Sequence, residues 1–198
     1  MKSERWLIAV NGKTEEIYVN ALRQRFRSSA VEVKVFAKDP LKQVEETETF
    51  AKRESTKFSR VYVVFDTDSF GHVVTDARKK IYDLDARARL KPKKPGCSWH
   101  AIVSVPCFEL WYLLHFQYTT AAFGVNTPCD DLRNQFAELF KSYSKVDPKA
   151  AKALVETKLT MACENAERLA SDLSTSKTDM WILVKALREK AEIDQSHK

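Results

Sequence analysis

The segment that most constrains the fold is the run VYVVF at residues 61–65, because every position in it is apolar. Side chains of a strand alternate between two faces, so such a run suits a parallel strand that is covered on both sides. Further β-branched or aromatic runs occur at 6–10, 31–36 and 99–104, separated by longer polar-apolar segments. This alternation is typical of βαβ units. We therefore expect an α/β fold with a four-stranded, mainly parallel sheet and helices on both faces.

The character of the chain changes after Pro106. Residues 107–116 (CFELWYLLHF) are almost wholly apolar, which predicts a buried helix. From residue 128 onward we find no strand signal, and the pattern predicts helical segments near 128–142, 148–172 and 178–193. We therefore expect an α/β domain over residues 1–120 and an all-helical extension over 121–198 that packs on it.

Composition excludes several kinds of site. With only four glycines, the 198 residues contain neither GxGxxG nor GxxxxGK[ST], so dinucleotide sites and P-loop nucleotide sites are excluded. The four cysteines form no CxxC pair, which argues against zinc ribbons and favours a reducing compartment. No apolar run approaches the roughly 20 residues of a membrane span. We expect a cytoplasmic protein that does not enter a membrane.

Polar residues follow three of the expected strands. Asp66 and Asp68 follow the central strand, Asn11 and Glu15 follow the first, and Glu109 follows the fourth. Ligands of a parallel sheet bind beyond the carboxyl ends of its strands. Residues i and i+2 of an extended chain share a face about 6.5 Å apart, so two carboxylates can converge on a hard cation. Glu15, Asp66, Asp68 and Glu109 are therefore candidate metal ligands at one rim.

The same residues also have simpler explanations. Glu15 and Glu109 could complement the dipoles of the helices that they begin, and Asp66 with Asp68 could belong to a turn. However, charge at the end of an apolar strand is costly without a cation. The four histidines share no ligand spacing, and His115 is predicted to be a core residue.

Basic residues concentrate in one stretch. Residues 78–94 hold eight lysines and arginines against Asp83 and Asp85, a surplus of six that equals the net charge of +6 of the whole chain. Such a stretch predicts contacts to a nucleic-acid backbone, and a solvated helix followed by a lysine-rich loop is the open alternative. The candidate residues are Arg78, Lys79, Lys80, Arg87, Arg89, Lys91, Lys93 and Lys94.

The sequence resembles RloB-like proteins of the Toprim fold. The matching stretches are VNGKTEEIY at 10–18, VFDTD at 64–68 and SVPCFELWYLLHF at 104–116, with weaker matches at 143–145, 165–166 and 178–179. The resemblance implies a Toprim-like α/β domain and a nuclease that uses Mg²⁺ or Mn²⁺. It also implies a role in abortive-infection or anti-phage defence, DNA or RNA as substrate, and an ATPase from a neighbouring gene as partner.

The resemblance also implies roles for individual residues. Asp66, Asp68 and Glu15 match the metal ligands, and Lys145 would stabilise charge on the scissile phosphate. The Toprim pattern has glutamate where this chain has Asn11, at the position of a general base or second-metal ligand. An amide oxygen can coordinate a cation but adds no charge and accepts no proton. Two-metal hydrolysis is thereby disfavoured, whereas one-metal chemistry is not.

Three functions follow from these patterns. The first is a metal-dependent phosphodiesterase that acts on nucleic acid. The second, favoured by Asn11, is a catalytically reduced Toprim protein that binds nucleic acid or a partner ATPase. The third is a phosphatase with an aspartyl-phosphate intermediate, since VVFDTDSF fits a hydrophobic strand followed by DxDx[TS]. That motif normally ends the first strand, whereas here it ends the third.

Overall fold

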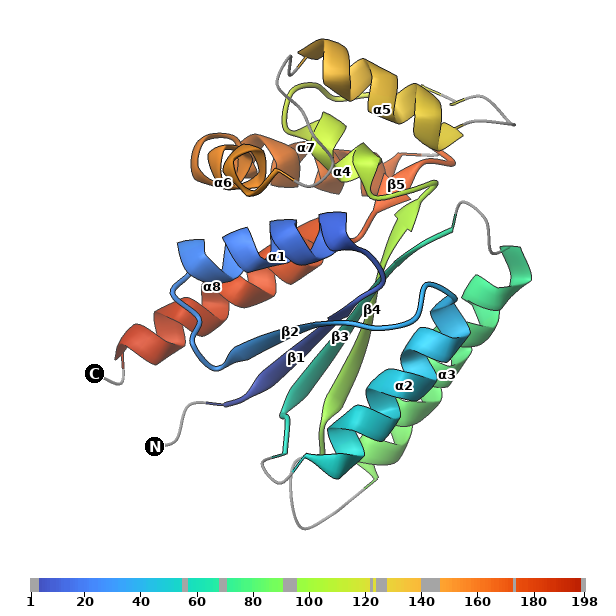
Figure 1. Cartoon of the computed structure of the whole chain (residues 1–198), viewed down its shortest axis with the longest axis vertical. Coiled ribbons are helices and arrows are strands. Elements are labelled where there is room, and N and C mark those ends of the chain that lie inside the picture. The colour runs from blue at the N-terminus through green and yellow to red at the C-terminus, as the bar shows by residue number, and fades with distance from the viewer. Residues whose placement is uncertain are drawn as a thin grey trace.

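The computed structural model describes residues 4–54, 57–67, 71–90, 96–121, 123, 128–139, 147–172 and 174–196. Within these residues the chain forms a five-stranded sheet in the order β2-β1-β3-β4-β5 (Figure 1). The strands are β1 Trp6–Val10, β2 Val31–Val35, β3 Arg60–Asp66, β4 Ser98–Val105 and β5 Lys177–Thr178. The helices are α1 Lys13–Arg25, α2 Pro40–Arg53, α3 Gly71–Arg89, α4 Glu109–Leu114, α5 Pro128–Leu139, α6 Pro148–Thr157, α7 Leu159–Ser171 and α8 Met180–Ser196.

The four strands that the sequence predicts are all present and mutually parallel. β1 pairs with both β2 and β3, and β3 pairs with β4. The five apolar residues of β3, 61–65, are all buried. The prediction of a mainly parallel sheet is therefore confirmed.

The prediction of four strands and an all-helical C-terminal part is wrong in one respect. β5 adds a fifth strand, antiparallel to β4, in which Thr178 pairs with Ser104. A strand of two residues is too short to show alternation, so periodicity could not reveal it. The single helix expected over 148–172 is two helices, which are separated at Lys158, where the backbone leaves helical geometry (φ −128°, ψ 4°).

Helices cover both faces of the sheet. In Figure 1, α2 and α3 lie on one face, and α1 and α8 lie on the other. Alternate residues of β1 accordingly enter two separate clusters: Ile8 packs in the cluster that contains Tyr18 and Leu187, and Leu7 packs with Val44. The first cluster joins side chains from before and after residue 120, so the C-terminal helices complete the core of the α/β part. The division at residue 120 stays a prediction.

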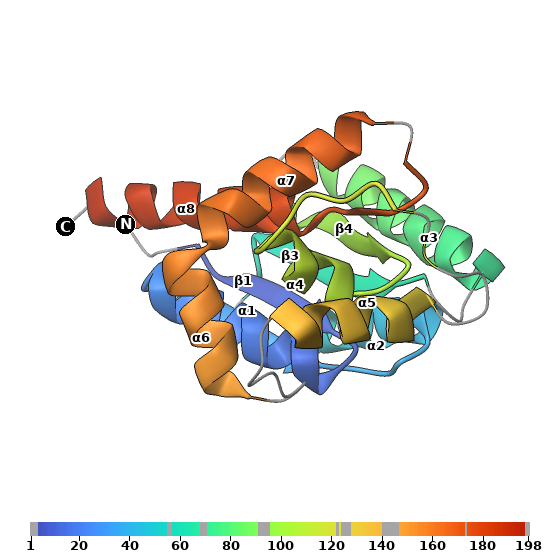
Figure 2. The same ribbon diagram turned by 90° about the horizontal axis from the view of Figure 1, so that it is seen from above.

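Several C-terminal helices gather at the carboxyl end of β4. α4 and α5 lie beyond that end in Figure 1, and Figure 2 shows α4 with α5, α6 and α7 around it. Both α2 and α6 begin with an aspartate cap followed by proline: Asp39 accepts from the Lys42 N–H and Asp147 from the Lys149 N–H. Across the described ranges, no helix is both long and apolar enough to cross a bilayer.

Candidate active site at the carboxyl ends of the strands

The site begins where β1 and β3 end side by side. Val10, the last residue of β1, is paired with Val64, and β3 continues for two residues to the half-buried Asp66. Asn11 follows β1 directly and is also half-buried. Parallel pairing therefore brings Asn11 and Asp66 to neighbouring strand ends, as the sequence predicts.

Glu15 lies in the first turn of α1 and is 7% exposed. Its carboxylate turns back toward the start of the helix, where a Cβ atom built on Gly12 would come within 2.4 Å of Oε2. Gly12 has an extended backbone (φ −152°, ψ 169°) that any residue can adopt, so the role of glycine here is to leave room for the Glu15 carboxylate. The next residue, Glu16, is paired with Lys13 at 2.6 Å. Of these two glutamates, it is Glu15 that points into the protein.

The chain segment after Asp66 is tied to the end of β4. The Thr67 N–H donates to the carbonyl oxygens of Ser104 and Pro106, each at 3.1 Å. Ser104 pairs with Asp66 in the sheet, and its hydroxyl lies 2.9 Å from that of Thr178 on β5. β5 thereby holds the strand that lies beside Asp66.

Asp179 is an acidic residue at this edge of the sheet that sequence reasoning did not single out. Its carboxylate accepts from the Val103 N–H at 3.2 Å and lies 3.9 Å from the Arg78 guanidinium. Burial raises the pKa of Asp179, and the Val103 N–H and the charge of Arg78 oppose that shift. The weak family match at 178–179 was the only sequence signal for this position.

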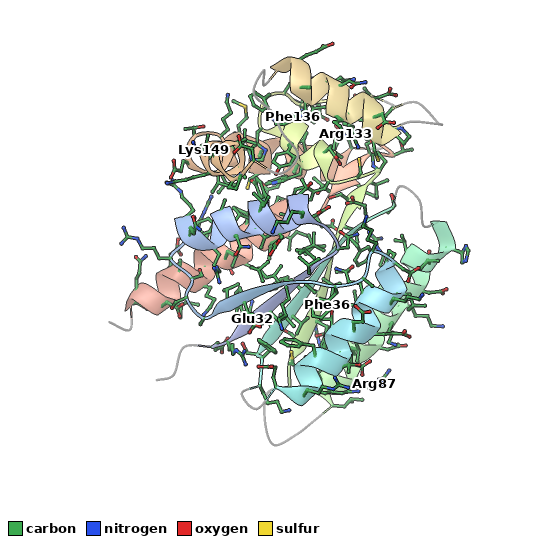
Figure 3. All side chains as sticks on the ribbon, in the orientation of Figure 1. Glu32, Phe36, Arg87, Arg133, Phe136 and Lys149 are labelled. Carbon is green, nitrogen blue, oxygen red and sulfur yellow. The ribbon has the colours of Figure 1, made fainter. Side chains whose placement is uncertain are left out.

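Glu109 is buried, 4% exposed, at the start of α4, where the sequence places it. Its Oε1 lies 3.6 Å from Nε of Arg133 on α5, and Arg133 also donates to Asp130 at 2.7 Å. Figure 3 labels Arg133 and Phe136, which lies one turn later on the same helix. Sequence reasoning missed Arg133, whose only signal is the need of a buried carboxylate for a cation.

The thiol of Cys107 is close enough to Asp66 and Glu109 to be affected by the charges of both. Its thiol is hydrogen-bonded to that of Cys129, and this contact, together with burial, raises the pKa of Cys107. The charges of Glu109 and Asp66 raise it further, so both carboxylates lie in the neighbourhood of one sulfur atom. Both cysteines are free thiols.

His115 belongs to the core, as predicted. Its Nε2 accepts from the Tyr18 hydroxyl at 2.8 Å, and its Nδ1 donates to the Trp111 carbonyl at 2.8 Å. Burial lowers the pKa of His115 to about 4. The histidine is therefore neutral at pH 7, and its side chain is fully buried in the core.

The basic residues of α3 do not form one patch. Lys80 is paired with Glu45 at 3.0 Å, and Arg89 is paired with Asp85 at 2.7 Å. Asp85 also accepts from the Trp99 N–H at the start of β4, so this part of α3 lies at the amino end of that strand. Arg89 and Arg87, which is labelled in Figure 3, are therefore far from the carboxyl ends of the strands. Arg78 and the exposed Lys79 lie nearer to them, in the first half of the 19-residue helix, whose length is about 28 Å.

Some of the predicted site residues lie outside the described residues: Asp68, Lys91, Lys93, Lys94 and Lys145. Within the part of the chain that the structure describes, no group of three or more His, Cys, Asp or Glu side chains could hold a metal ion. Glu15, Asp66 and the Asn11 amide offer the oxygen donors that Mg²⁺ and Mn²⁺ prefer. This donor set fits such a cation in kind, and a complete site needs at least one further ligand.

The chain is thus an α/β protein with a mainly parallel sheet and acidic side chains at its carboxyl edge, the edge at which open α/β sheets generally bind ligands. A family model described as RloB-like protein matches residues 6–187. The chain therefore belongs to the RloB-like family, as its sequence motifs predict. Comparison with curated proteins gave no match, and comparison with solved structures gave none either.

Proposed function

We propose that the protein is a Mg²⁺- or Mn²⁺-dependent nuclease with a Toprim-like sheet, acting in anti-phage or abortive-infection defence. The observation that carries the proposal is the position of Asp66 at the end of a buried central strand, beside the end of β1, from which Asn11 follows and Glu15 turns back toward Gly12. Such a concentration of oxygen donors suits a hard cation. The parallel order β2-β1-β3-β4 and the family membership support the same proposal.

In this proposal Asp66, Glu15 and Asp68 hold the cation. When bound, the cation would supply charge stabilisation at the phosphate and lower the pKa of a water molecule. Asn11 would contribute an oxygen ligand but could not accept the proton of the attacking water. Proton removal would therefore fall to bulk water or to the substrate.

Positive charge at the scissile phosphate would come from two side chains. Arg133 is held between Glu109 and Asp130, so its guanidinium is oriented before a substrate arrives. Preorganised cations stabilise developing charge more effectively than mobile ones. Lys145 has the same role in the family resemblance and stays a prediction.

A second function is favoured by Asn11. A chain with one acidic ligand fewer than the Toprim pattern could bind nucleic acid, or a partner ATPase, without cleaving. The two functions differ in their dependence on Asp66, since an aspartate that only ends a strand is dispensable for binding.

The deciding experiment is a cleavage assay on tRNA, single-stranded RNA, single-stranded DNA and duplex DNA with Mg²⁺, Mn²⁺ or EDTA. We expect metal-dependent cleavage of at least one substrate and a loss of 100-fold or more in Asp66→Asn. Asp76→Asn, the same change at an exposed position of α3, is the matched control and should keep full activity. Absence of both cleavage and metal binding in the wild-type chain would favour the second function.

A further inference from the structure

A groove between α1 and α6 has no role in the site described so far. It has a volume of about 310 Å³, and Ile17 and Ala21 of α1 are among its lining residues. Lysines stand on both of its sides: Lys13 on α1, and Lys149 and Lys152 on α6. Figure 3 shows Lys149 on α6, close above α1.

The charge of the groove is positive. Its lining contains three lysines and one carboxylate, that of Glu16, which gives a net charge of +2. Glu16 pairs with Lys13 at 2.6 Å, and Lys152 lies 3.7 Å from Glu156 outside the groove. Each pair joins two residues on the surface of a single helix, the first on α1 and the second on α6. Such surface ion pairs contribute little to stability, so an incoming phosphate can compete for the lysines.

The groove starts at the candidate active site. Lys13 is the first residue of α1, two positions from both Asn11 and Glu15. From there the lining continues along α1 to Gln24, a distance of about 16 Å at the rise of an α-helix. This length corresponds to roughly five nucleotides of one duplex strand, counted at its rise of 3.4 Å per phosphate along the helix axis.

We infer that the groove between α1 and α6 binds the phosphodiester backbone of the nucleic acid that enters the active site. The inference rests on the proposed function for the identity of the ligand. Charge complementarity and continuity with the strand ends favour this groove over α3, where Arg87 and Arg89 lie at the opposite end of the sheet.

The test is a charge reversal in the groove with a matched reversal on α3. Lys149→Glu/Lys152→Glu is compared with Lys79→Glu/Arg87→Glu, which changes the net charge by the same amount at exposed positions. Binding of fluorescein-labelled 20-nucleotide RNA and 20-base-pair DNA is followed by anisotropy in EDTA, so that no cleavage occurs. Lys149→Arg/Lys152→Arg keeps the charge and serves as the rescue variant.

We expect the groove reversal to weaken binding at least tenfold and to lower the slope of log affinity against log salt by about 0.7 to 0.9 per lost phosphate contact. The α3 reversal should change affinity less than threefold, and the arginine variant should bind like the wild type. Equal weakening by both reversals, no weakening by either, or no binding by the wild-type chain would overturn the inference.

A second measurement separates this inference from the proposed function. Hydrolysis of a small activated phosphodiester, bis(p-nitrophenyl) phosphate, needs the metal site but no groove, so the groove reversal should leave its rate unchanged. If wild-type protein binds nucleic acid through the groove but hydrolyses neither substrate, the nuclease proposal fails and the groove inference stands. If the groove reversal also abolishes hydrolysis of the small diester, the lysines act in the active site and the inference is overturned.

Discussion

Glu15 keeps its carboxylate in the space that a side chain at Gly12 would fill, with Oε2 2.4 Å from the position of a Cβ atom there. The orientation of Glu15 therefore depends on the absence of a side chain at position 12. Because the conflict involves only the end of a flexible side chain, the structure can relieve it by rotating that carboxylate away.

This relationship predicts the effect of Gly12→Ala. We expect the stability of the variant to change by less than about 1 kcal/mol, because the lower entropy of the unfolded chain, which favours alanine by about 0.4 to 1 kcal/mol, offsets the displacement of the Glu15 carboxylate. Metal binding and cleavage should nevertheless fall tenfold or more, because the carboxylate is displaced. Combination with Glu15→Gln should add little further loss, since both changes remove the same group. Full additivity of the two losses would show that Gly12 acts independently of Glu15.

The amide at position 11 predicts weak metal binding. Asn11→Glu adds a negative ligand beside Asp66, so calorimetric titration should show tighter binding of Mg²⁺ or Mn²⁺, and cleavage should reach its maximum at lower metal concentration. Asn11→Ala, which removes the oxygen donor, is the matched comparison. A wild-type chain that cleaves faster than Asn11→Glu would instead make the amide a working part of the site.

The ion pair between the buried Glu109 and the partly exposed Arg133 predicts a coupling between α4 and α5. Arg133→Met should destabilise the protein by about 1 to 3 kcal/mol, because the carboxylate of Glu109 loses its cation. Glu109→Gln in the same chain should restore part of that loss. A double-mutant cycle on urea unfolding measures the coupling, and a value near zero would mean that the pair contributes no stability.

His115 predicts a pH dependence of stability. Its pKa of about 4 in the folded protein lies below the ordinary value of 6.5, so the unfolded chain binds more protons between these values. The stabilising contribution is complete well above pH 6.5 and is lost as the pH falls toward 4, and the loss has reached about 2 kcal/mol at pH 5. The physical cause is burial, which disfavours the charged imidazolium; a protonated Nε2 could also no longer accept from the Tyr18 hydroxyl.

His115→Gln provides the check on this pH dependence. The variant should be less stable than the wild type at pH 7. Between pH 7 and pH 5, however, its free energy of unfolding should fall by about 2 kcal/mol less than that of the wild type. Urea unfolding at both pH values gives the comparison. Parallel pH profiles in the two proteins would contradict the assignment to His115.

The four parallel strands could be predicted because each carries its own local signal. Residues 61–65 are apolar throughout, and 31–36 alternate, so their strands could be placed without knowledge of the rest of the chain. β5 is defined by its pairing with Ser104, a contact between residues more than 70 positions apart, and two residues contain no period. The break at Lys158 also lacks a proline or glycine that would have marked it.

The candidate site likewise has features that the sequence could predict and features that it could not. That Asn11 and Asp66 meet at one edge follows from the parallel arrangement of their strands, so topology alone predicts it. The partner of Glu109 does not follow from topology, because Arg133 reaches it from a helix whose docking depends on the apolar packing around Phe136. Ion pairs between distant elements leave no spacing in the sequence by which they could be recognised.

The place of α8 on the sheet affects how the protein is made. The same cluster that buries Trp6 and Ile8 of the first strand also contains Leu183 and Leu187 of the last helix. A ribosome that has released the residues of the candidate active site, the last of which is Lys145, has therefore not yet supplied the helix that covers their sheet, since α8 begins at Met180. The nascent chain would keep one apolar face exposed until α8 emerges, so the proposed nuclease activity would arise only after α8 has been made, and chains terminated before α8 would be substrates for proteases rather than active nucleases.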